Sequence, residues 1–539
     1  MQRLWILLVM VCLVGTGNAE VPRKKLIELG WDIPTTQYLR EHWEEMERTT
    51  PFDGVIYTLN PAPGRKGADS QGLFSKEHPW DKNEYAKCLE DMKACRFTKF
   101  TDNFIRVNFH PGDTDWDDDA GWKVILDKVS ICAWIAKQSG SKGLCLDFES
   151  YGYPMFRYSA DSGRTFAEMK SLAKKRGAEL LQTVAKEFPD ATLLALWLNS
   201  INRQAGKAVQ PDLVLQTSEY GLLPAFINGM LSVLPKEMVL VDGCEKGYMM
   251  NSPSAFQTAA LDMVLWTGTC AKLVEPEYRQ TYRSQVQCGF GVYLDMYTND
   301  EGTLYYRVPE GREKTRLDRF MANLGSAVAS ADQYVWVYGE KNRWWNVKKD
   351  NPKMKTWEAA LPGITVRMNA LRDPFTFAKQ KRESLKSDPA AKNLLKNPDF
   401  SQKNPNADLP AEWAVWQNEK TSHGTFHWKE NRAVFREMEE GCFIQGIPVH
   451  PGEVYLLYAK GKATGKATLH LTASWKTAED KWTRWDASTR LDLDSSGTEI
   501  FGLVTVPEEA GRMIVLPSIS GQGADDTGEY EKVEVYLLN

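Results

Sequence analysis

Short apolar runs alternate with longer amphipathic stretches up to about residue 380, and this alternation constrains the fold more than any other feature of the 539-residue chain. Runs rich in Val, Leu, Ile and aromatic residues are typical of buried parallel strands, and amphipathic stretches between them are typical of crossover helices. Eight such runs in this order predict an α/β fold of the (β/α)8 TIM-barrel type. A doubly wound sheet usually has fewer strands and often a Gly-rich phosphate turn, which the sequence lacks. The runs are 26–30, 54–58, 103–108, 143–148, 192–198, 238–241, 291–294 and 334–338, and the helical stretches are 35–48, 83–95, 122–138, 165–188, 222–234, 255–272 and 314–331.

The composition changes near residue 380. Residues 381–392 (KRESLKSDPAAK) are charged and contain Pro389, with Leu385 as their only large apolar side chain, which is typical of an exposed linker. The sequence therefore predicts a barrel domain over 20–380, a linker over 381–392 and a second domain over 393–539. Alternating runs divided by Gly, Asp and Pro turns predict that the second domain is an all-β sandwich or jelly roll. Its clearest runs are 453–458, 466–474, 499–506 and 513–518.

The amino end has the pattern of an export signal. Arg3 precedes the apolar run 4–14, and the small residues Gly17 and Ala19 follow it at the spacing of a signal-peptidase site. We therefore predict a signal peptide over 1–19, cleaved after Ala19, and a secreted or periplasmic protein. The run is too short to span a bilayer, and no later stretch reaches about 18 apolar residues, so no membrane association is expected.

Charge and cysteine content exclude several functions. The net charge of −5 provides no basic field for nucleic acid, whereas 19 Trp residues favour a surface for sugar rings. No CxxC pair or Cys/His cluster appears, so no metal or other cofactor is expected in the barrel. Eight cysteines follow the predicted signal peptide, and their apolar, scattered surroundings predict that most are buried thiols.

A TIM barrel carries its site just beyond the carboxyl ends of the strands. Acidic residues dominate these positions. Only one of the seven histidines follows a strand, so a His-centred triad or a multi-His metal site is poorly supported. The polar residues at the strand ends are Asp32, Asn108, His110, Asp147, Glu149, Asn199, Asp242, Glu245, Asp295 and Glu340.

The fourth strand gives the sharpest local signal, KGLCLDFE over 142–149. Because side chains alternate along a strand, Asp147 and Glu149 are predicted to point together into the barrel mouth. Two carboxylates this close repel each other, so one is expected to hold a proton near neutral pH, as a general acid must. The segment resembles the DxxDxDxE strand of glycoside hydrolase family 18, with Lys142 and Cys145 in place of the first two Asp. The resemblance implies that Glu149 is the acid and that Asp147 supports it.

A glycosidase usually needs a second carboxylate near the first. Asp295, Glu245 and Glu340 are the candidates, and we favour the two Glu residues because their side chains are longer and have aromatic neighbours. Aromatic residues near the strand ends, among them Trp31 and Tyr248, are candidates for the wall of a cleft. The predicted substrate-binding set is Asp32, Asn108, His110, Tyr151, Asn199, Asp242, Tyr293, Trp336, Trp344 and Trp345.

The second domain opens with NLLKNPDF over 393–400 and closes with the alternating strand 531–538. Both segments resemble carbohydrate-binding modules of families 4 and 9, which implies a galactose-binding-like β-sandwich. Asp399 is a candidate ligand for a structural calcium ion, with an Asx turn as the stronger alternative.

The chain as a whole resembles exported glycoside hydrolases of polysaccharide-degrading bacteria. The resemblance implies hydrolysis of an oligo- or polysaccharide, with Glu149 as general acid/base and Glu245 or Glu340 as nucleophile or base. Two alternatives stay open. One is a glycan-binding protein that keeps the barrel without catalysis. The other is a polysaccharide lyase that recruits Asn108, His110 and Tyr151, although the sequence has no basic cluster to bind an acidic sugar.

Overall fold

A computed structural model describes residues 24–538 apart from residues 150, 311–314, 346–353, 372–373, 484–487, 495 and 508, so the predicted signal peptide lies outside the described residues. Nine parallel strands form one sheet in the order β7-β6-β5-β4-β3-β2-β1-β9-β8. The two end strands are consecutive in the chain and are separated only by Gly289, so the sheet curves into a barrel that is nearly closed. The strands are β1 (Lys25–Gly30), β2 (Gly54–Tyr57), β3 (Phe104–Asn108), β4 (Gly143–Asp147), β5 (Thr192–Ala195), β6 (Val239–Asp242), β7 (Val286–Cys288), β8 (Phe290–Tyr293) and β9 (Tyr334–Gly339).

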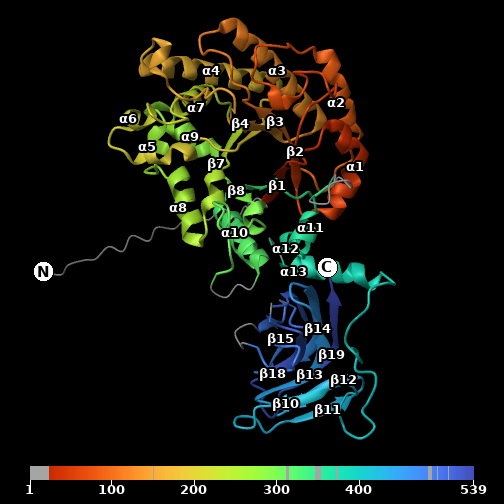
Figure 1. Ribbon diagram of the computed structural model, residues 1–539. Helices are drawn as coiled ribbons and strands as arrows, with labels where there is room; N and C mark the ends of the chain where they lie inside the picture. The colour runs from red at the N-terminus through yellow and green to blue at the C-terminus, as the bar shows by residue number, and fades with distance from the viewer. Residues whose placement is uncertain are drawn as a thin grey trace, which may run out of the picture.

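The barrel prediction is confirmed, and the eight predicted runs correspond to all strands except β7. Helices cover the outside of the sheet (Figure 1). Their starts follow local chemistry: Thr165 and Thr315, for example, accept hydrogen bonds from the third backbone N–H of the helix in capping boxes. The predicted helices are α1 (Thr36–Thr49), α2 (Lys82–Ala94), α3 (Asp119–Ser139), α4 (Phe166–Glu187), α7 (Leu223–Ser232), α8 (Pro253–Val264) and α10 (Arg316–Ser330), and short helices α5 (Arg203–Lys207), α6 (Pro211–Leu215), α9 (Arg279–Gln285), α11 (Trp357–Ala360) and α12 (Ile364–Ala370) add to them.

Helix α8 is shorter than the predicted stretch 255–272. The chain folds back at Gly268, where an added Cβ would lie 2.4 Å from the carbonyl oxygen of Asp262. Leu265 and Trp266, which come just before this turn, are exposed, whereas Cys270 and Leu273 beyond it are buried again. The apolar pattern therefore continues past the end of the helix and, taken alone, extends the helix too far.

The second domain is an antiparallel β-sandwich, as predicted. One sheet has the order β10-β13-β18-β15-β16 and the other the order β11-β12-β19-β14-β17. Alternate residues of both sheets, such as Phe443, Trp475 and Tyr530, are buried between them. The strands are β10 (Ala414–Gln417), β11 (Thr425–Lys429), β12 (Arg432–Arg436), β13 (Glu440–Pro448), β14 (Val454–Ala463), β15 (Thr468–Lys476), β16 (Thr489–Asp492), β17 (Glu499–Thr505), β18 (Arg512–Ser520) and β19 (Gly528–Leu537).

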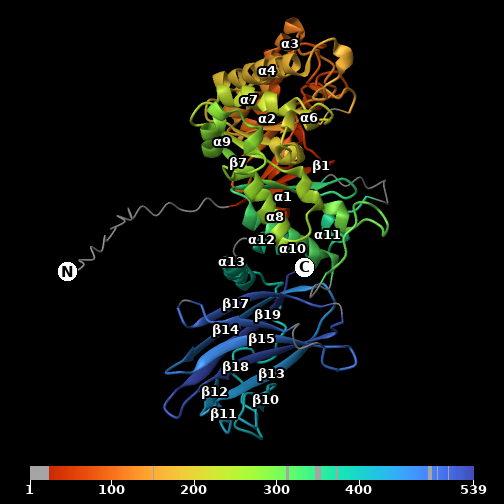
Figure 2. The same cartoon turned by 90° about the vertical axis from the view of Figure 1, so that its left-hand side faces the viewer.

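The segment predicted as an exposed linker over 381–392 is partly helical. Helix α13 (Pro374–Lys386) lies between the barrel and the sandwich and packs on β17 (Figures 1 and 2). Arg382 is buried there, because its Nε donates to Glu534 Oε2 at 2.6 Å and its guanidinium lies 3.3 Å from the centre of the Tyr458 ring. The charged composition of the segment did not indicate this buried helix. Arg382 can be buried because Glu534 of the sandwich neutralises its charge.

Two further features concern the described residues as a whole. The eight cysteines in the described part of the chain are free and buried, which confirms the sequence prediction. No described helix is long and apolar enough to cross a membrane.

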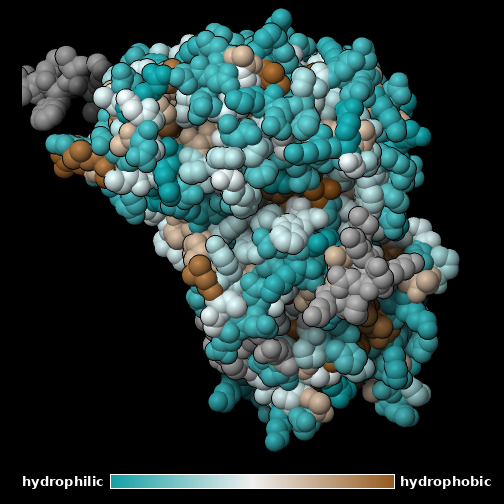
Figure 3. Space-filling view, turned by 45° about the horizontal axis from the view of Figure 1, so that its top comes forward, coloured by the Kyte–Doolittle hydropathy of each residue, from teal (hydrophilic) through white to brown (hydrophobic). Residues whose placement is uncertain are grey.

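On the face that Figure 3 shows, hydrophilic residues predominate and hydrophobic ones occur in small, separate groups.

Candidate active site

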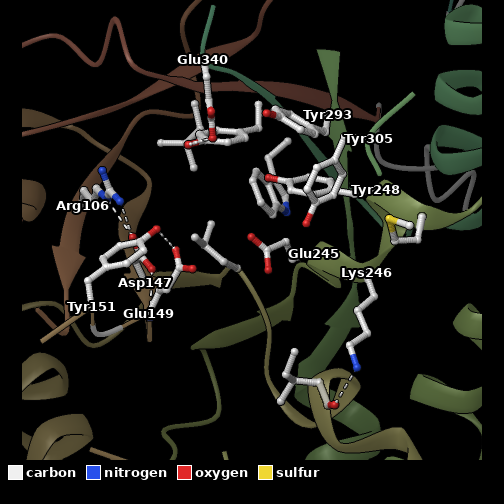
Figure 4. Close-up of a pocket in the computed structure, with 16 residues that line it drawn as sticks. Arg106, Asp147, Glu149, Tyr151, Glu245, Lys246, Tyr248, Tyr293, Tyr305 and Glu340 are labelled. Atoms are coloured by element: carbon white, nitrogen blue, oxygen red, sulfur yellow. Dashed lines mark hydrogen bonds and ion pairs between the residues drawn. The ribbon is translucent and has the colours of Figure 1, made fainter. Parts of the chain in front are cut away.

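A cavity of about 400 Å³ opens at the carboxyl ends of the barrel strands. Four carboxyl side chains, several tyrosines and two cationic side chains surround it (Figure 4). This is the end of a TIM barrel where ligands bind. The lining residues are Leu29, Arg106, Asp147, Glu149, Tyr151, Leu196, Ile201, Glu245, Lys246, Tyr248, Met249, Tyr293, Tyr305, Trp336, Tyr338 and Glu340.

Asp147 ends β4 and is completely buried. Its Oδ2 accepts hydrogen bonds from Arg106 Nε at 3.0 Å and from Asn108 Nδ2 at 3.1 Å, and Arg106 Nη2 completes the ion pair. Arg106 and Asn108 are two residues apart on β3, so both point to the same side as Asp147. The other oxygen of Asp147 accepts the backbone N–H of Glu149 at 3.1 Å. Asp147 is therefore an anion fixed by Arg106, and it positions Glu149.

Replacing Arg106 with Met should destabilise the protein strongly. The variant leaves a buried carboxylate without its cation, which typically costs about 3–5 kcal/mol of unfolding free energy. Urea unfolding followed by circular dichroism measures the change. The double variant Arg106→Met/Asp147→Leu removes both charges and should recover most of the loss. A single variant as stable as the unmodified protein would contradict this account of the pair.

Glu149 follows β4 and is partly buried at the cavity. The Tyr151 hydroxyl donates a hydrogen bond to Glu149 Oε2. Burial raises the pKa of Glu149, the bond from Tyr151 opposes this rise, and the negative charge of Asp147 adds to it. Glu149 therefore has a donor that stabilises its ionised form.

Glu245 begins the turn that follows β6 and points toward Glu149 across the cavity (Figure 4). No side chain among the described residues donates a hydrogen bond to its carboxyl group. Burial, together with the negative charges of Glu149 and Asp147, raises the pKa of Glu245 to about 8, and Lys246 only partly offsets the effect. Glu245 thus carries a proton at neutral pH.

Glu340 follows β9 on the other side of the cavity, away from Glu149 and Glu245 (Figure 4). Its Oε1 accepts a hydrogen bond from the Tyr338 hydroxyl at 3.1 Å. Asp295 holds the backbone in place, because its carboxylate accepts the N–H groups of Glu340 at 2.7 Å and Lys341 at 2.9 Å. Asp295 is completely buried and serves to position this loop.

Aromatic rings form one wall of the cavity. The rings of Tyr248 and Tyr293 have centres 5.2 Å apart and those of Tyr293 and Tyr338 have centres 5.4 Å apart, with both pairs 30° from parallel. Trp336 packs against Tyr248, with ring centres 5.4 Å apart, and its indole N–H donates to the Gly243 carbonyl oxygen at 2.8 Å. Gly291 leaves room for that ring, because an added Cβ would lie 2.5 Å from it. The wall offers flat apolar surface beside acceptor oxygens, which suits the face of a sugar ring.

The structure brings together at the cavity seven of the predicted site residues, namely Asp147, Glu149, Tyr151, Glu245, Tyr293, Trp336 and Glu340. The other predicted residues do not line it. Asp242 is buried and accepts the N–H groups of Leu198 at 3.0 Å and Ser200 at 2.9 Å. Asn199 is buried and donates to the Cys270 carbonyl oxygen at 3.3 Å. These two residues hold the loops after β5 and β6 together.

Trp344 and Trp345, predicted as a sugar platform, pack inward instead. Asp32 causes this: its Oδ2 accepts the N–H of Trp344 at 2.6 Å, and its carbonyl oxygen accepts the indole N–H of Trp345 at 2.6 Å. Trp344 packs edge-on against Phe52. Asp32 therefore acts as a loop anchor and does not line the cavity.

Asn108 and His110 also lie outside the cavity lining. Asn108 supports Asp147, and its Oδ1 accepts the backbone N–H of His110 at 2.7 Å. Sequence reasoning missed Arg106 and Tyr338. The signal for Arg106 was present, since a cation two residues before Asn108 on β3 must face the same side, next to the acidic end of β4.

No group of three or more His, Cys, Asp or Glu residues that could hold a metal ion occurs among the described residues. In the sandwich, Asp399 Oδ1 accepts hydrogen bonds from Ser401 N at 3.2 Å and Ser401 Oγ at 2.8 Å, which is the geometry of an Asx turn. The turn gives this carboxylate a structural partner within the chain.

No family model matches the chain, and no curated protein matches it. Solved structures do match. The enzymatically active domain of tailspike protein 4 of bacteriophage CBA120 is 16% identical, with 27% of this chain and 21% of that chain covered at a TM-score of 0.22. A family 4 carbohydrate-binding module is 21% identical, with 26% and 99% covered at a TM-score of 0.21. An arabinose-bound α-L-arabinofuranosidase of glycoside hydrolase family 51 is 16% identical, with 27% and 26% covered at a TM-score of 0.20.

The chain thus spans about a fifth of the phage domain and about a quarter of the arabinofuranosidase.

Proposed function

We propose that this protein hydrolyses glycosidic bonds in an oligo- or polysaccharide. One observation carries the proposal: Glu149 and Glu245 face each other across a cavity at the carboxyl end of a TIM barrel, and both carboxyl groups have a raised pKa. A protonated and an ionised carboxyl group on either side of a glycosidic bond are the minimal machinery for its hydrolysis.

The two groups differ in their surroundings, and this difference favours one assignment of roles. The sequence gives the role of general acid to Glu149. In the folded chain the Tyr151 hydroxyl stabilises the anion of Glu149, whereas Glu245 has two negative neighbours and a pKa of about 8. We therefore assign the acid to Glu245 and the nucleophile or base to Glu149.

In the proposed reaction Glu245 donates its proton to the glycosidic oxygen while the bond from that oxygen to the anomeric carbon breaks. The bonding electron pair leaves on the oxygen, and the departing sugar becomes an alcohol. Glu149 either adds to the anomeric carbon and is later displaced by water, or removes a proton from a water that adds there directly. One water is consumed in both cases, and its oxygen and one of its protons become the new hydroxyl group on the anomeric carbon. Its other proton returns to Glu245, directly in the first route and by way of Glu149 and solvent in the second. Proton NMR of the first-formed anomer distinguishes the two routes.

The charge of the cavity argues against a polysaccharide lyase. Four carboxyl groups line it, and of its two cations Arg106 is already paired with Asp147. A lyase must bind the carboxylate of a uronate, which this arrangement repels.

A panel of polysaccharides tests the proposal, read for released reducing ends with the unmodified protein and with Glu149→Gln and Glu245→Gln. We expect cleavage by the unmodified protein and its loss in both folded variants. Saccharide binding without cleavage would mean that the protein is a glycan-binding protein and not a hydrolase. An unsaturated product that absorbs in the ultraviolet would mean that it is a lyase.

A further inference from the structure

Trp31 is an exposed tryptophan that is hydrogen-bonded to Tyr338, one of the residues that line the cavity. It follows β1, and 66% of its surface is open to solvent. Its indole Nε1 donates to the Tyr338 hydroxyl at 3.0 Å, and its backbone N–H donates to the Gly339 carbonyl oxygen at 3.0 Å. The next residue, Asp32, is anchored to Trp344. Both the backbone and the ring of Trp31 are therefore fixed while its face stays uncovered.

The same hydrogen bonds connect Trp31 to a carboxylate in the cavity. Tyr338 accepts from Trp31 and donates to Glu340 Oε1 at 3.1 Å. No cation among the described residues pairs with the carboxylate of Glu340. Tyr338 thus sets the positions of an aromatic face on one side and an acceptor oxygen on the other.

We infer that Trp31, Tyr338 and Glu340 form a second sugar subsite beside the catalytic pair, which would make the protein act on chains of several sugar units. The inference rests on the proposed function. The Trp31 ring stacks on the apolar face of a sugar, and Glu340 accepts hydrogen bonds from its hydroxyl or amine groups. An ionised carboxylate accepts hydrogen bonds but donates none, so it has nothing to offer the carboxylate of an acidic sugar. The subsite therefore takes a sugar unit without acidic groups.

Rigid placement is the physical reason to assign binding to Trp31. Single exposed tryptophans are normal on a protein surface, and Trp482 and Trp266 are exposed to a similar extent, so exposure alone assigns no role. What distinguishes Trp31 is the hydrogen bond of its indole N–H to a tyrosine of the cavity. The hydrogen bond holds the Trp31 ring by its polar atom and leaves the ring face free. It therefore reduces the loss of side-chain entropy that accompanies ligand binding. Glu340 is likewise preorganised, because Asp295 fixes its backbone.

Calorimetric titration with cellotetraose, xylotetraose, mannotetraose and tetragalacturonate tests the subsite, with the monosaccharides as comparison. We expect Trp31→Ala to weaken binding of the preferred neutral tetrasaccharide about tenfold and to leave monosaccharide binding unchanged. Trp31→Phe should retain most of the affinity. The matched control is Trp266→Ala, which removes a tryptophan that is 56% exposed and does not line the cavity. Tetragalacturonate should bind poorly to every form.

The titration separates this inference from the proposed function, because it does not need turnover. Tenfold weaker binding by Trp31→Ala in a protein that cleaves nothing would support the subsite and overturn the hydrolase. Equal affinities of the Trp31→Ala and Trp266→Ala variants would overturn the subsite, even if hydrolysis is found. The subsite is also overturned if no neutral tetrasaccharide binds, or if tetragalacturonate binds best.

Discussion

Replacing Glu149 with Gln should lower kcat/KM for saccharide hydrolysis by at least about 10³-fold, because the variant removes the group that attacks the anomeric carbon or activates water. Gln has nearly the same shape as Glu and still accepts a hydrogen bond from Tyr151, so the fold should persist. Reducing-end assays measure the activity, and thermal unfolding checks the fold.

A comparison with Glu340→Gln sharpens this test. Glu340 also lines the cavity but lies across it from the catalytic pair. Its replacement should weaken binding with a much smaller effect on kcat. If Glu340→Gln abolishes turnover and Glu149→Gln does not, the catalytic carboxylate has been assigned to the wrong strand.

The barrel and the position of Asp147 and Glu149 could be predicted from the sequence because both follow from local periodicity. Strand-length apolar runs alternate with helical ones, and side chains on a strand alternate with period two. The break at Gly289, which divides β7 from β8, left no signal in the pattern of apolar residues, and neither did the early end of helix α8.

The roles of the other strand-end acids could not be predicted in the same way. Asp32, Asp242 and Asp295 all turn back and accept backbone N–H groups of neighbouring loops, whereas Glu245 and Glu340 reach the cavity. A strand-end carboxylate bonds either to a loop or to a ligand. The choice depends on loop conformations set by residues far apart in the chain, as when Asp295 anchors Glu340. The longer Glu side chain favours the cavity, and this was the one usable signal.

Glu245→Gln should abolish the alkaline limb of the activity profile. In the unmodified protein the proton on Glu245 is lost as the pH rises through about 8, so kcat/KM should fall above that value. Gln donates no proton to the leaving group, and we expect about 10²- to 10⁴-fold lower activity on saccharides. An activated 2,4-dinitrophenyl glycoside needs little protonation and should be cleaved with a much smaller loss. An equal loss of activity on both substrates would show that Glu245 is not the general acid.

Glu245 should also make the stability of the folded protein depend on pH. The pKa of a free Glu is 4.5 and that of Glu245 in the folded protein is about 8, so the folded state holds the proton more tightly than the unfolded state. This contribution to stability is fully present below pH 4.5 and is lost as the pH rises to about 8. Because Gln stays neutral, Glu245→Gln should unfold at a temperature higher than the unmodified protein by roughly 2 °C or more at pH 9, with little difference at pH 4.

Glu237→Gln is the matched control for this measurement, because Glu237 is exposed and precedes β6, at the end of the strand away from Glu245. Its effect on the unfolding temperature should be small at both pH values. A difference for Glu245→Gln that is the same at pH 4 and pH 9 would mean that Glu245 titrates like a surface carboxyl. The proton required of the general acid would then be absent at neutral pH, and the assignment of Glu245 as the acid would fail together with the predicted alkaline limb.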